Sequence, residues 1–321
     1  MRPFKSIDEQ IEILESRGLL FKDKEKARSY LLRNNYYNVV NMYSKLFQEN
    51  VNKYLPNTYF EDIKALHIYD TEIKALLMKY ILIAEKHFKS IFAHYFAEKY
   101  HDLQAFSYLN TSNYKTETPF EITKTLSFIS KTINDQIRSS KNNSVKHNFQ
   151  KHKDVPIWVI VNELSFGNII KLYKFSDDKT RNKVAIELST ILKTNINKHI
   201  KLEPDYIDKI LQNILDIRNC VAHNNKLLNF KCKNNFKYLK PLYQDTGIQP
   251  KDSRQNPFDV LIFLQCFLTT EDYSILHNSI RKRTIYMCKK IDSDIVNEIY
   301  KSYGFPKDWA KNAKKIPQIQ N

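Results

Sequence analysis

The sequence predicts an all-α protein. The chain has 321 residues but only four glycines, which leaves few residues suited to the hairpins and bulges of a sheet-rich fold. Apolar residues recur at helical spacing through most of the chain, and no segment shows the alternation that is typical of a strand. No two glycines lie close enough to form a phosphate-binding loop. We therefore expect one compact helical bundle with a smaller N-terminal helical piece.

The N-terminal region shows short amphipathic segments. Ser6 and Glu9 have the spacing of a capping box, and Gly18 follows where a helix commonly ends. Pro56 then interrupts the chain. The expected helical segments of this region cover residues 6–17, 24–33 and 36–48.

The longest helical pattern spans residues 59–100, and Thr58 and Glu61 have the spacing of a capping box at its start. The pattern is compatible with one helix or with two helices and a bend. The basic, polar stretch 138–155 is expected to be a loop. Further helices are expected over 120–137, 157–175, 179–194, 205–228, 257–268, 271–291 and 294–303. The expected organisation is an N-terminal helical subdomain (1–55), a main helical domain (56–304) and a basic C-terminal tail (305–321).

The formal net charge is +16, from 51 Lys and Arg against 35 Asp and Glu. Such a balance favours a polyanionic partner, either nucleic acid or an anionic membrane surface. Lysine dominates the basic residues, and Lys, Asn, Ile, Tyr and Phe share A/T-rich codons. Part of the charge can therefore reflect base composition, so local basic clusters are more informative than the total.

The four cysteines show no C-x-x-C pair and no spacing typical of a metal site. We therefore expect buried free thiols in a reducing compartment, with neither a metal ion nor a cofactor. The N-terminus lacks the apolar region of a signal peptide, and no run of 18 apolar residues occurs. These features predict a cytoplasmic protein that does not span a membrane.

The most informative stretch is L-D-I-R-N-C-V-A-H-N-N-K at 215–226, which we expect to be helical. Asn219 and His223 are i,i+4 neighbours on one helical face. Arg218 lies about 140° around the axis from His223, but its long side chain can swing toward that face. The segment thus combines a permanent cation, an amide and a titratable imidazole. The alternative is an ordinary surface pair or a core histidine whose ring nitrogens are hydrogen-bonded.

A run without acidic residues, at 225–240, begins at the end of this segment. It carries interleaved aromatic residues. Lysines pair with phosphates and aromatic rings stack on bases, so the run is a candidate RNA track. A solvated basic loop with its aromatic residues folded inward is an equally open interpretation. The lysines are Lys226, Lys231, Lys233, Lys237 and Lys240, and the aromatic residues are Phe230, Phe236 and Tyr238.

Three motifs, in order over residues 4–230, give the chain a family resemblance. R-N-C-V-A-H fits the R-x(4)-H motif of HEPN domains. The N-terminal segment, with its R-G-L and its later Y-Y pair, resembles the opening of the Abi-like abortive-infection proteins of the AbiF/AbiD type. The stretch P-I-W-V-I-V-N-E-L-S-F-G at 156–167 resembles that family's P-I-W-x-x-x-E-x-x-S-F-G segment, with Asn162 at the position of the pattern's Glu and Glu163 one residue later.

The resemblance implies an HEPN-like helical bundle that acts as a metal-independent endoribonuclease toxin in antiphage defence. In such enzymes the 2′-hydroxyl of the RNA attacks the adjacent phosphate. Arg218 would then bind the scissile phosphate, His223 would transfer protons, and Asn219 would orient His223 or the RNA. HEPN ribonucleases commonly pair two motifs across a two-fold axis, so the resemblance also implies a homodimer. Some relatives are linked to small noncoding RNAs, which implies an RNA regulator as a further partner.

This sequence departs from the family pattern at several positions. Asn224 stands where a second His is frequent, and Lys226 stands where Arg is frequent. Glu85 matches an upstream family Glu, but Lys89 replaces the Arg expected after it. Lys89 and His94 have the spacing of the R-x(4)-H motif, so a degenerate second half-site is an alternative to a solvated stripe of histidines.

The second family stretch contains Trp158, Glu163 and Phe166. Helix packing, with Gly167 allowing close approach, is the favoured interpretation of these residues. Glu163 is also a candidate for orienting a catalytic side chain. Two other function classes remain open for the whole chain, namely a non-catalytic RNA-binding protein and an interaction protein that senses a phage component.

Overall fold

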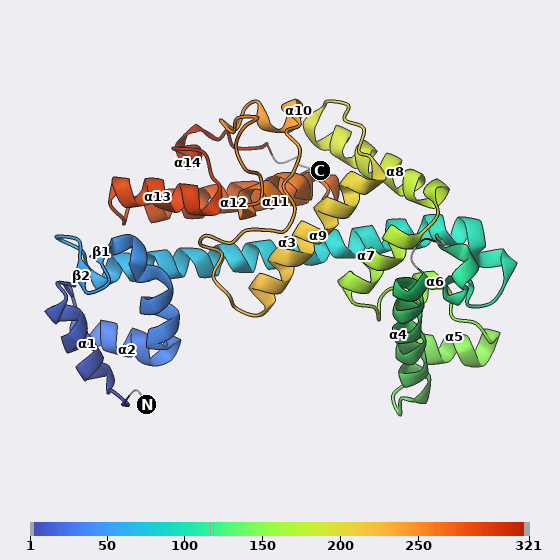
Figure 1. Cartoon of the computed structure of the whole chain (residues 1–321), viewed down its shortest axis with the longest axis horizontal. Coiled ribbons are helices and arrows are strands. Elements are labelled where there is room, and N and C mark those ends of the chain that lie inside the picture. Colours follow the sequence, from blue (N-terminus) through green and yellow to red (C-terminus); the bar gives the residue numbers. More distant parts are fainter. Residues whose placement is uncertain (1–2, 116, 118, 318–321) are drawn as a thin grey trace.

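The computed structural model describes residues 3–115, 117 and 119–317, and its architecture is all-α, as predicted (Figure 1). The expected segments do not include the short antiparallel ribbon of β1 (Gln48–Asn50) and β2 (Lys53–Tyr54), nor the short helices at Lys240–Tyr243 and Trp309–Asn312. The helices are α1 (Ile7–Ser16), α2 (Lys24–Asn34), α3 (Phe60–Tyr100), α4 (Pro119–Arg138), α5 (Ser144–His152), α6 (Ile157–Ile160), α7 (Phe166–Phe175), α8 (Asp178–Ile196), α9 (Pro204–Ala222), α10 (Lys240–Tyr243), α11 (Pro257–Phe263), α12 (Thr270–Cys288), α13 (Ser293–Tyr303) and α14 (Trp309–Asn312). None of the helices in the described ranges combines the length and the apolar character needed to cross a membrane.

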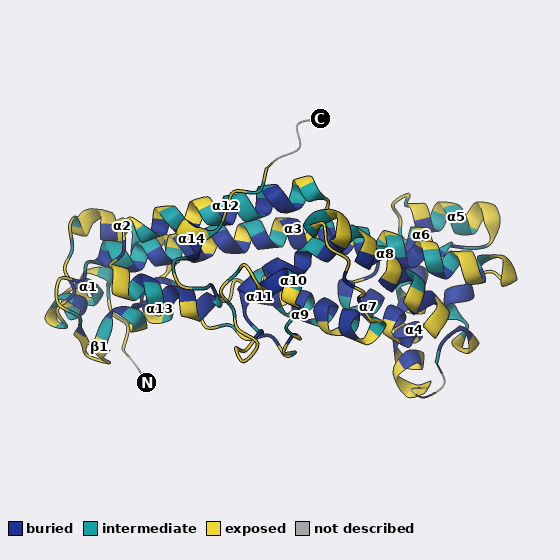
Figure 2. Ribbon diagram, turned by 90° about the horizontal axis from the view of Figure 1, so that it is seen from above, coloured by how far each residue is buried: buried dark blue, intermediate teal, exposed yellow. Residues whose placement is uncertain are grey.

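Helix α3 is the axis of the molecule. Its 41 residues form one unbroken helix, about 60 Å long, which runs along most of the long dimension in Figures 1 and 2. The capping box expected at Thr58 and Glu61 is wrong by one residue, because Asp62 accepts the Tyr59 N–H at 2.8 Å. Helix α12 lies alongside α3, and α9 crosses it obliquely.

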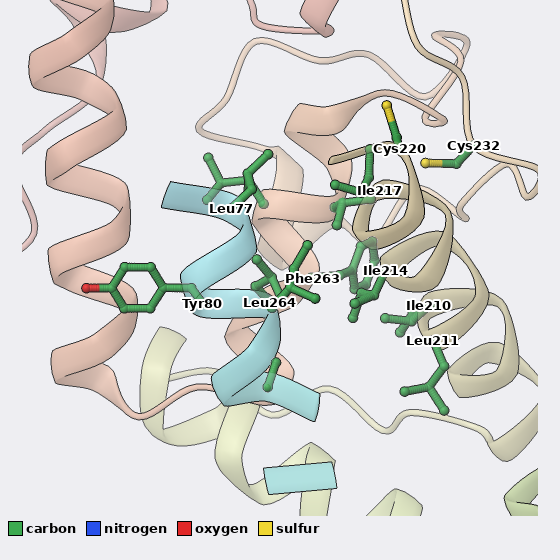
Figure 3. Close-up of a cluster of buried hydrophobic side chains, with 14 of the residues drawn as sticks. Leu77, Tyr80, Ile210, Leu211, Ile214, Ile217, Cys220, Cys232, Phe263 and Leu264 are labelled. Atoms are coloured by element: carbon green, nitrogen blue, oxygen red, sulfur yellow. The ribbon is translucent and has the colours of Figure 1, made fainter. Parts of the chain in front are cut away.

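The buried core joins α9 to α3. Figure 3 shows Ile210, Ile214 and Ile217 of α9 directed toward Leu77 of α3 and Phe263 of α11. All five side chains are buried. Burial of each such side chain contributes about 1.5–3 kcal/mol relative to an exposed position. This apolar face fixes the position of the helix that carries Arg218 and its neighbours.

A buried carboxylate ties distant parts of the chain together. Asp70 of α3 is fully buried and accepts hydrogen bonds from the Tyr43 hydroxyl at 2.5 Å, the Leu227 N–H at 3.1 Å and the Tyr303 hydroxyl. The Lys74 ammonium lies 3.3 Å from the same carboxylate. Burial raises the pKa of both phenols, so both hydroxyls remain donors. Asp70 thus joins the N-terminal region, α3, the segment after α9, and α13.

One local expectation is confirmed in the structure, and two others are not. The Ser6–Glu9 capping box is confirmed at the start of α1. The expected loop over 138–155 contains α5, whose N-cap Asn143 accepts the Lys146 N–H at 2.8 Å. Most of the expected segment 36–48 is irregular, with a π-helical turn (Tyr37–Asn41) at its beginning and a 3-10 turn (Ser44–Phe47) at its end.

The C-terminal segment is not a free tail over its described part. Phe305 and Trp309 are buried, and both rings pack against Phe258 of α11. This packing places residues up to α14 on the main helical domain.

Asp259 is a buried carboxylate in the first turn of α11. It accepts the Asn256 N–H at 2.9 Å and the Tyr243 hydroxyl at 3.3 Å. Burial raises the pKa of Asp259 to about 6. The native state therefore holds this proton more tightly than the unfolded state does between pH 4 and 6, so the contribution of Asp259 to stability rises as the pH falls through that window.

We expect Asp70→Ala to lower the free energy of unfolding by about 3–5 kcal/mol, because it leaves an ammonium and three other buried donors without their acceptor. Urea denaturation followed by circular dichroism measures the change. The exposed Asp135→Asn serves as a control and should shift stability by less than about 0.5 kcal/mol. Equal effects of the two substitutions would contradict a structural role for Asp70.

We also expect Asp259→Asn to remove one component of the pH dependence of stability. The free energy of unfolding of the variant, relative to wild type, should fall by about 2 kcal/mol between pH 7 and pH 4. Taking the difference between the two proteins cancels the other titrating groups. A difference that is independent of pH would show that Asp259 titrates normally.

Candidate active site

Helix α9 ends in a left-handed cap. His223 is the C-cap residue, and the N–H groups of Asn224 and Asn225 donate to the carbonyls of Val221 and Cys220, both at 2.9 Å. Asn224 has a φ of 53°, the left-handed conformation that Asn tolerates better than most residues with a Cβ atom. This hydrogen-bond pattern is the Schellman motif, which ends the helix. The departure from the family pattern at Asn224 is thus also the residue that terminates α9.

The expected continuation of this helix to residue 228 is wrong. Lys226 therefore does not share a helical segment with Arg218 and His223. Its ammonium donates to the Met42 carbonyl at 3.0 Å, so it fastens the N-terminal region to the segment after α9. Beside it, the Asn224 side chain accepts from Lys74 of α3 at 2.9 Å.

Asn219 and His223 lie together on the outer face of α9, and both are exposed. The Asn219 carbonyl accepts the His223 N–H at 3.1 Å. One turn earlier on the same face, Asp216 accepts from Gln212 at 3.0 Å. The imidazole therefore stands at the open end of a helix, with an amide one turn below it.

Arg218 occupies a different side of α9. It is half-buried, and its Nε is enclosed without a hydrogen-bond partner among the described residues. Five residues of helix place it about 140° around the axis from His223, on the side of the buried Ile214. A single chain thus brings Asn219 and His223 together but does not place Arg218 on their face. The enclosed Nε is closed to a ligand, but the terminal nitrogens of Arg218 have no protein partner among the described residues and could bind an anion.

The segment 225–240, which carries the predicted RNA-binding lysines, lies against the outer side of α9. Asp216 accepts the Lys233 N–H at 3.0 Å, and Asn213 is hydrogen-bonded to Asn234 in both directions. These bonds set the backbone of Lys233 beside the helical face that carries His223. Of the five predicted RNA-binding lysines, Lys231, Lys233, Lys237 and Lys240 are exposed, whereas Lys226 is partly buried.

The aromatic residues of this segment are not free to stack on bases. Phe236 is 1% exposed, and its ring centroid lies 4.4 Å from that of Phe263. Phe230 and Tyr238 are partly buried against the core. The inward-folded interpretation is therefore correct for Phe236, and the segment offers charge rather than base stacking.

The groups available around His223 are suited to acid–base and electrostatic chemistry. Burial raises the pKa of the neighbouring Cys220 to about 11, so this thiol is protonated at neutral pH and is a poor nucleophile. Among the residues that the structure describes, no group of three or more His, Cys, Asp or Glu side chains is placed to hold a metal ion. An imidazole, a guanidinium, an amide and several ammonium groups remain.

Glu85 and Lys89, two of the predicted supporting residues, do not lie at the cap of α9. Glu85 and Lys89 form a nearly buried ion pair at 2.8 Å, and Lys89 also donates to the Leu164 carbonyl at 2.8 Å. Lys74 of α3 contacts the cap of α9 through Asn224. Glu85 lies about 16 Å further along α3 than Lys74. One oxygen of Glu85 is buried without a partner among the described residues. Through Lys89, this ion pair is hydrogen-bonded to the segment that precedes α7, and it does not contact the cap of α9.

Glu163 and His94 are also separate from the cap of α9. Glu163 accepts from Gln136 of α4 at 3.2 Å. His94 is exposed on α3. Lys89 and His94 both line a groove, but their motif-like spacing does not bring them to His223.

Sequence reasoning missed the exposure of Trp158. Phe166 is buried, as helix packing predicts, but Trp158 is 48% exposed and lines the same groove as His94. Gly167 is not required for close approach, because a Cβ atom there would lie 3.6 Å from Leu215, an ordinary contact distance. No signal in the sequence separates Trp158 from Phe166, because exposure depends on tertiary packing.

A comparison with protein families matches one family over most of the chain. The family described as Abi-like protein matches residues 29–229, a region that includes α3, the P-I-W stretch and the whole of α9. The chain therefore belongs to the Abi-like protein family, and this membership supports a role in abortive-infection defence. Comparisons with curated proteins and with solved structures gave no match.

The left-handed cap predicts different effects for two substitutions at Asn224. Asn224→Ala should lower the free energy of unfolding by about 1–2 kcal/mol, because a Cβ atom without a local polar group disfavours this conformation. Asn224→Gly keeps the backbone conformation and should lose only the bond from Lys74, about 1 kcal/mol or less. Thermal unfolding measures both changes. An alanine variant more stable than the glycine variant would contradict the assigned cap.

Proposed function

We propose that this chain is a metal-independent endoribonuclease that acts as a toxin in abortive infection. The observation that carries the proposal is the open end of α9, where His223 and Asn219 are exposed together, with the half-buried Arg218 five residues before His223 on another side of the helix. The exposed lysines beside α9 add a positive surface for a phosphate backbone. Family membership adds the link to abortive infection.

The proposed reaction is an internal transfer within the RNA. The 2′-oxygen attacks the adjacent phosphorus, the bond to the 5′-oxygen breaks, and the products carry a 2′,3′-cyclic phosphate and a 5′-hydroxyl. One base must take the proton from the 2′-hydroxyl, and one acid must give a proton to the departing 5′-oxygen. His223 serves one of these roles, Asn219 orients it or the RNA, and Arg218 stabilises the charge on the phosphate oxygens.

A two-fold homodimer would supply the second imidazole. One chain contributes one R-x(4)-H motif, and it places Arg218 about 140° from His223 on α9. Two copies that face each other would provide two imidazoles and let Arg218 of one copy serve His223 of the other. A noncoding RNA regulator is a further partner in this proposal, and it would use the same basic surface.

A non-catalytic RNA-binding protein is the second candidate function. The observation that favours it is the separation of Arg218 from His223 on different sides of α9 within one chain. Such a protein would bind RNA with a strong salt dependence and leave it intact.

The test is incubation of the wild-type protein and its variants with total cellular RNA in EDTA, followed by mapping of the ends. We expect His223→Ala and Arg218→Ala each to lower the cleavage rate by at least about a hundredfold, because each removes a group that acts on the reacting phosphate. The exposed His199→Ala is the matched control and should cleave as wild type does.

The mapped ends should carry 5′-hydroxyls and 2′,3′-cyclic phosphates. Cleavage that survives both substitutions would overturn the proposed site. Binding of RNA by the wild-type protein without any new ends would favour the second candidate.

A further inference from the structure

A groove separate from the α9 cap runs between the C-terminal half of α3 and α6. Its volume is about 670 Å³. It begins at Lys86, about 18 Å along α3 from the Lys74 that contacts the cap. The residues that matter for its chemistry are Lys86, Lys89, His94, His101, Trp158 and Asn162.

Trp158 presents its ring to this groove from a rigid support. Ile157 and Ile160 of the short helix α6 are buried and anchor it, while Trp158 is 48% exposed. The indole meets the imidazole of His101, the residue that directly follows α3, in a T-shaped arrangement with ring centroids 4.6 Å apart. An aromatic side chain held half in solvent, in a groove with polar and charged walls, has the form of a stacking platform for a base.

The walls of the groove favour a phosphate backbone over a neutral ligand. Lys86 is exposed and makes no ion pair within the described ranges. His94 lines the same wall, and so does Lys89, whose charge is balanced by its ion pair with Glu85 at 2.8 Å. Of the two acidic residues there, Glu98 is paired with Lys183 at 2.6 Å, which leaves Asp102 as the opposing charge.

The neighbouring surface extends this positive charge. Helix α5 packs against α6 (Figure 1) and carries Lys146, His147, Lys151 and His152, of which His147, Lys151 and His152 are exposed. A polyanion that lies in the groove would therefore meet further cations beyond Trp158.

We propose that this groove binds a single-stranded segment of RNA, with one base stacked on Trp158 and adjacent phosphates beside Lys86 and His94. The inference rests on the proposed function for the choice of RNA as the polymer. It adds a second contact site, remote from the cap of α9, that binds a part of the RNA strand away from the scissile phosphate. Loss of one stacked base weakens binding by about 1–3 kcal/mol, which is about a 5- to 150-fold rise in Kd.

Tryptophan fluorescence tests the proposal directly, because the chain has only two tryptophans. Trp309 is 5% exposed and packed against Phe258, so Trp309→Phe leaves Trp158 as the reporter. The probe is an oligouridylate of about 12 nucleotides, added to protein that also carries His223→Ala so that the strand stays intact. We expect strong quenching with the Trp309→Phe protein and none with the Trp158→Phe protein.

Binding of labelled oligouridylate, followed by fluorescence anisotropy, gives the second readout. Trp158→Ala should raise Kd by about 5- to 150-fold, and Trp158→Phe, which keeps an aromatic face, should recover much of the loss. Tyr286→Ala is the matched control, because Tyr286 is 53% exposed on α12 and outside the groove. It should leave Kd unchanged.

Three results would overturn the proposal. The first is the absence of quenching by the oligouridylate. The second is equal quenching by inorganic polyphosphate, which carries charge but no base. The third is equal quenching by the mononucleotide UMP, which would make the groove a nucleotide site rather than a strand site. Quenching that persists while no variant or wild-type protein cleaves RNA would sink the nuclease proposal and leave this one standing.

Discussion

The structure depends on the buried carboxylate of Asp70 and the donors that surround it. A carboxylate with no exposure to water is tolerated only when its oxygens are paired, and here the partners come from four separate parts of the chain. Through Leu227 the carboxylate holds the segment that follows α9, and through Tyr43 and Tyr303 it holds the N-terminal and C-terminal regions of the chain against α3. The position of the α9 cap is therefore coupled to the whole fold.

This coupling explains why His223 and the lysines are presented as they are. The chain must leave α9 at the cap to reach Asp70, and the left-handed Asn224 provides that turn. The segment then returns along the outer side of α9, where Asp216 fixes it near the exposed face of the helix. Lys226 donates to the Met42 carbonyl and is partly buried. The positive charge available to a ligand therefore comes from the exposed lysines between Lys231 and Lys240.

The helical architecture and most of its segments could be predicted from the sequence, because they follow from local periodicity and capping. The errors arose where a tertiary contact decided the outcome. The apolar Leu227 extends the helical pattern beyond Ala222, but its backbone N–H is taken by Asp70, a residue 157 positions away. The pairing of Glu85 with Lys89 was readable as an i,i+4 spacing, whereas the exposure of Trp158 depends on how α6 meets α3. The site residues themselves came from motif resemblance, and their proposed roles are not derivable from periodicity.

The central claim is that the end of α9 cuts RNA through the RNA's own 2′-hydroxyl. The most direct measurement compares an RNA that the protein cleaves with the same RNA carrying a single 2′-deoxy nucleotide immediately 5′ to one mapped cut, both in EDTA. The account predicts that cleavage disappears at the substituted position and continues at all others. Continued cleavage at the 2′-deoxy position would contradict it, because the nucleophile would then have to come from elsewhere.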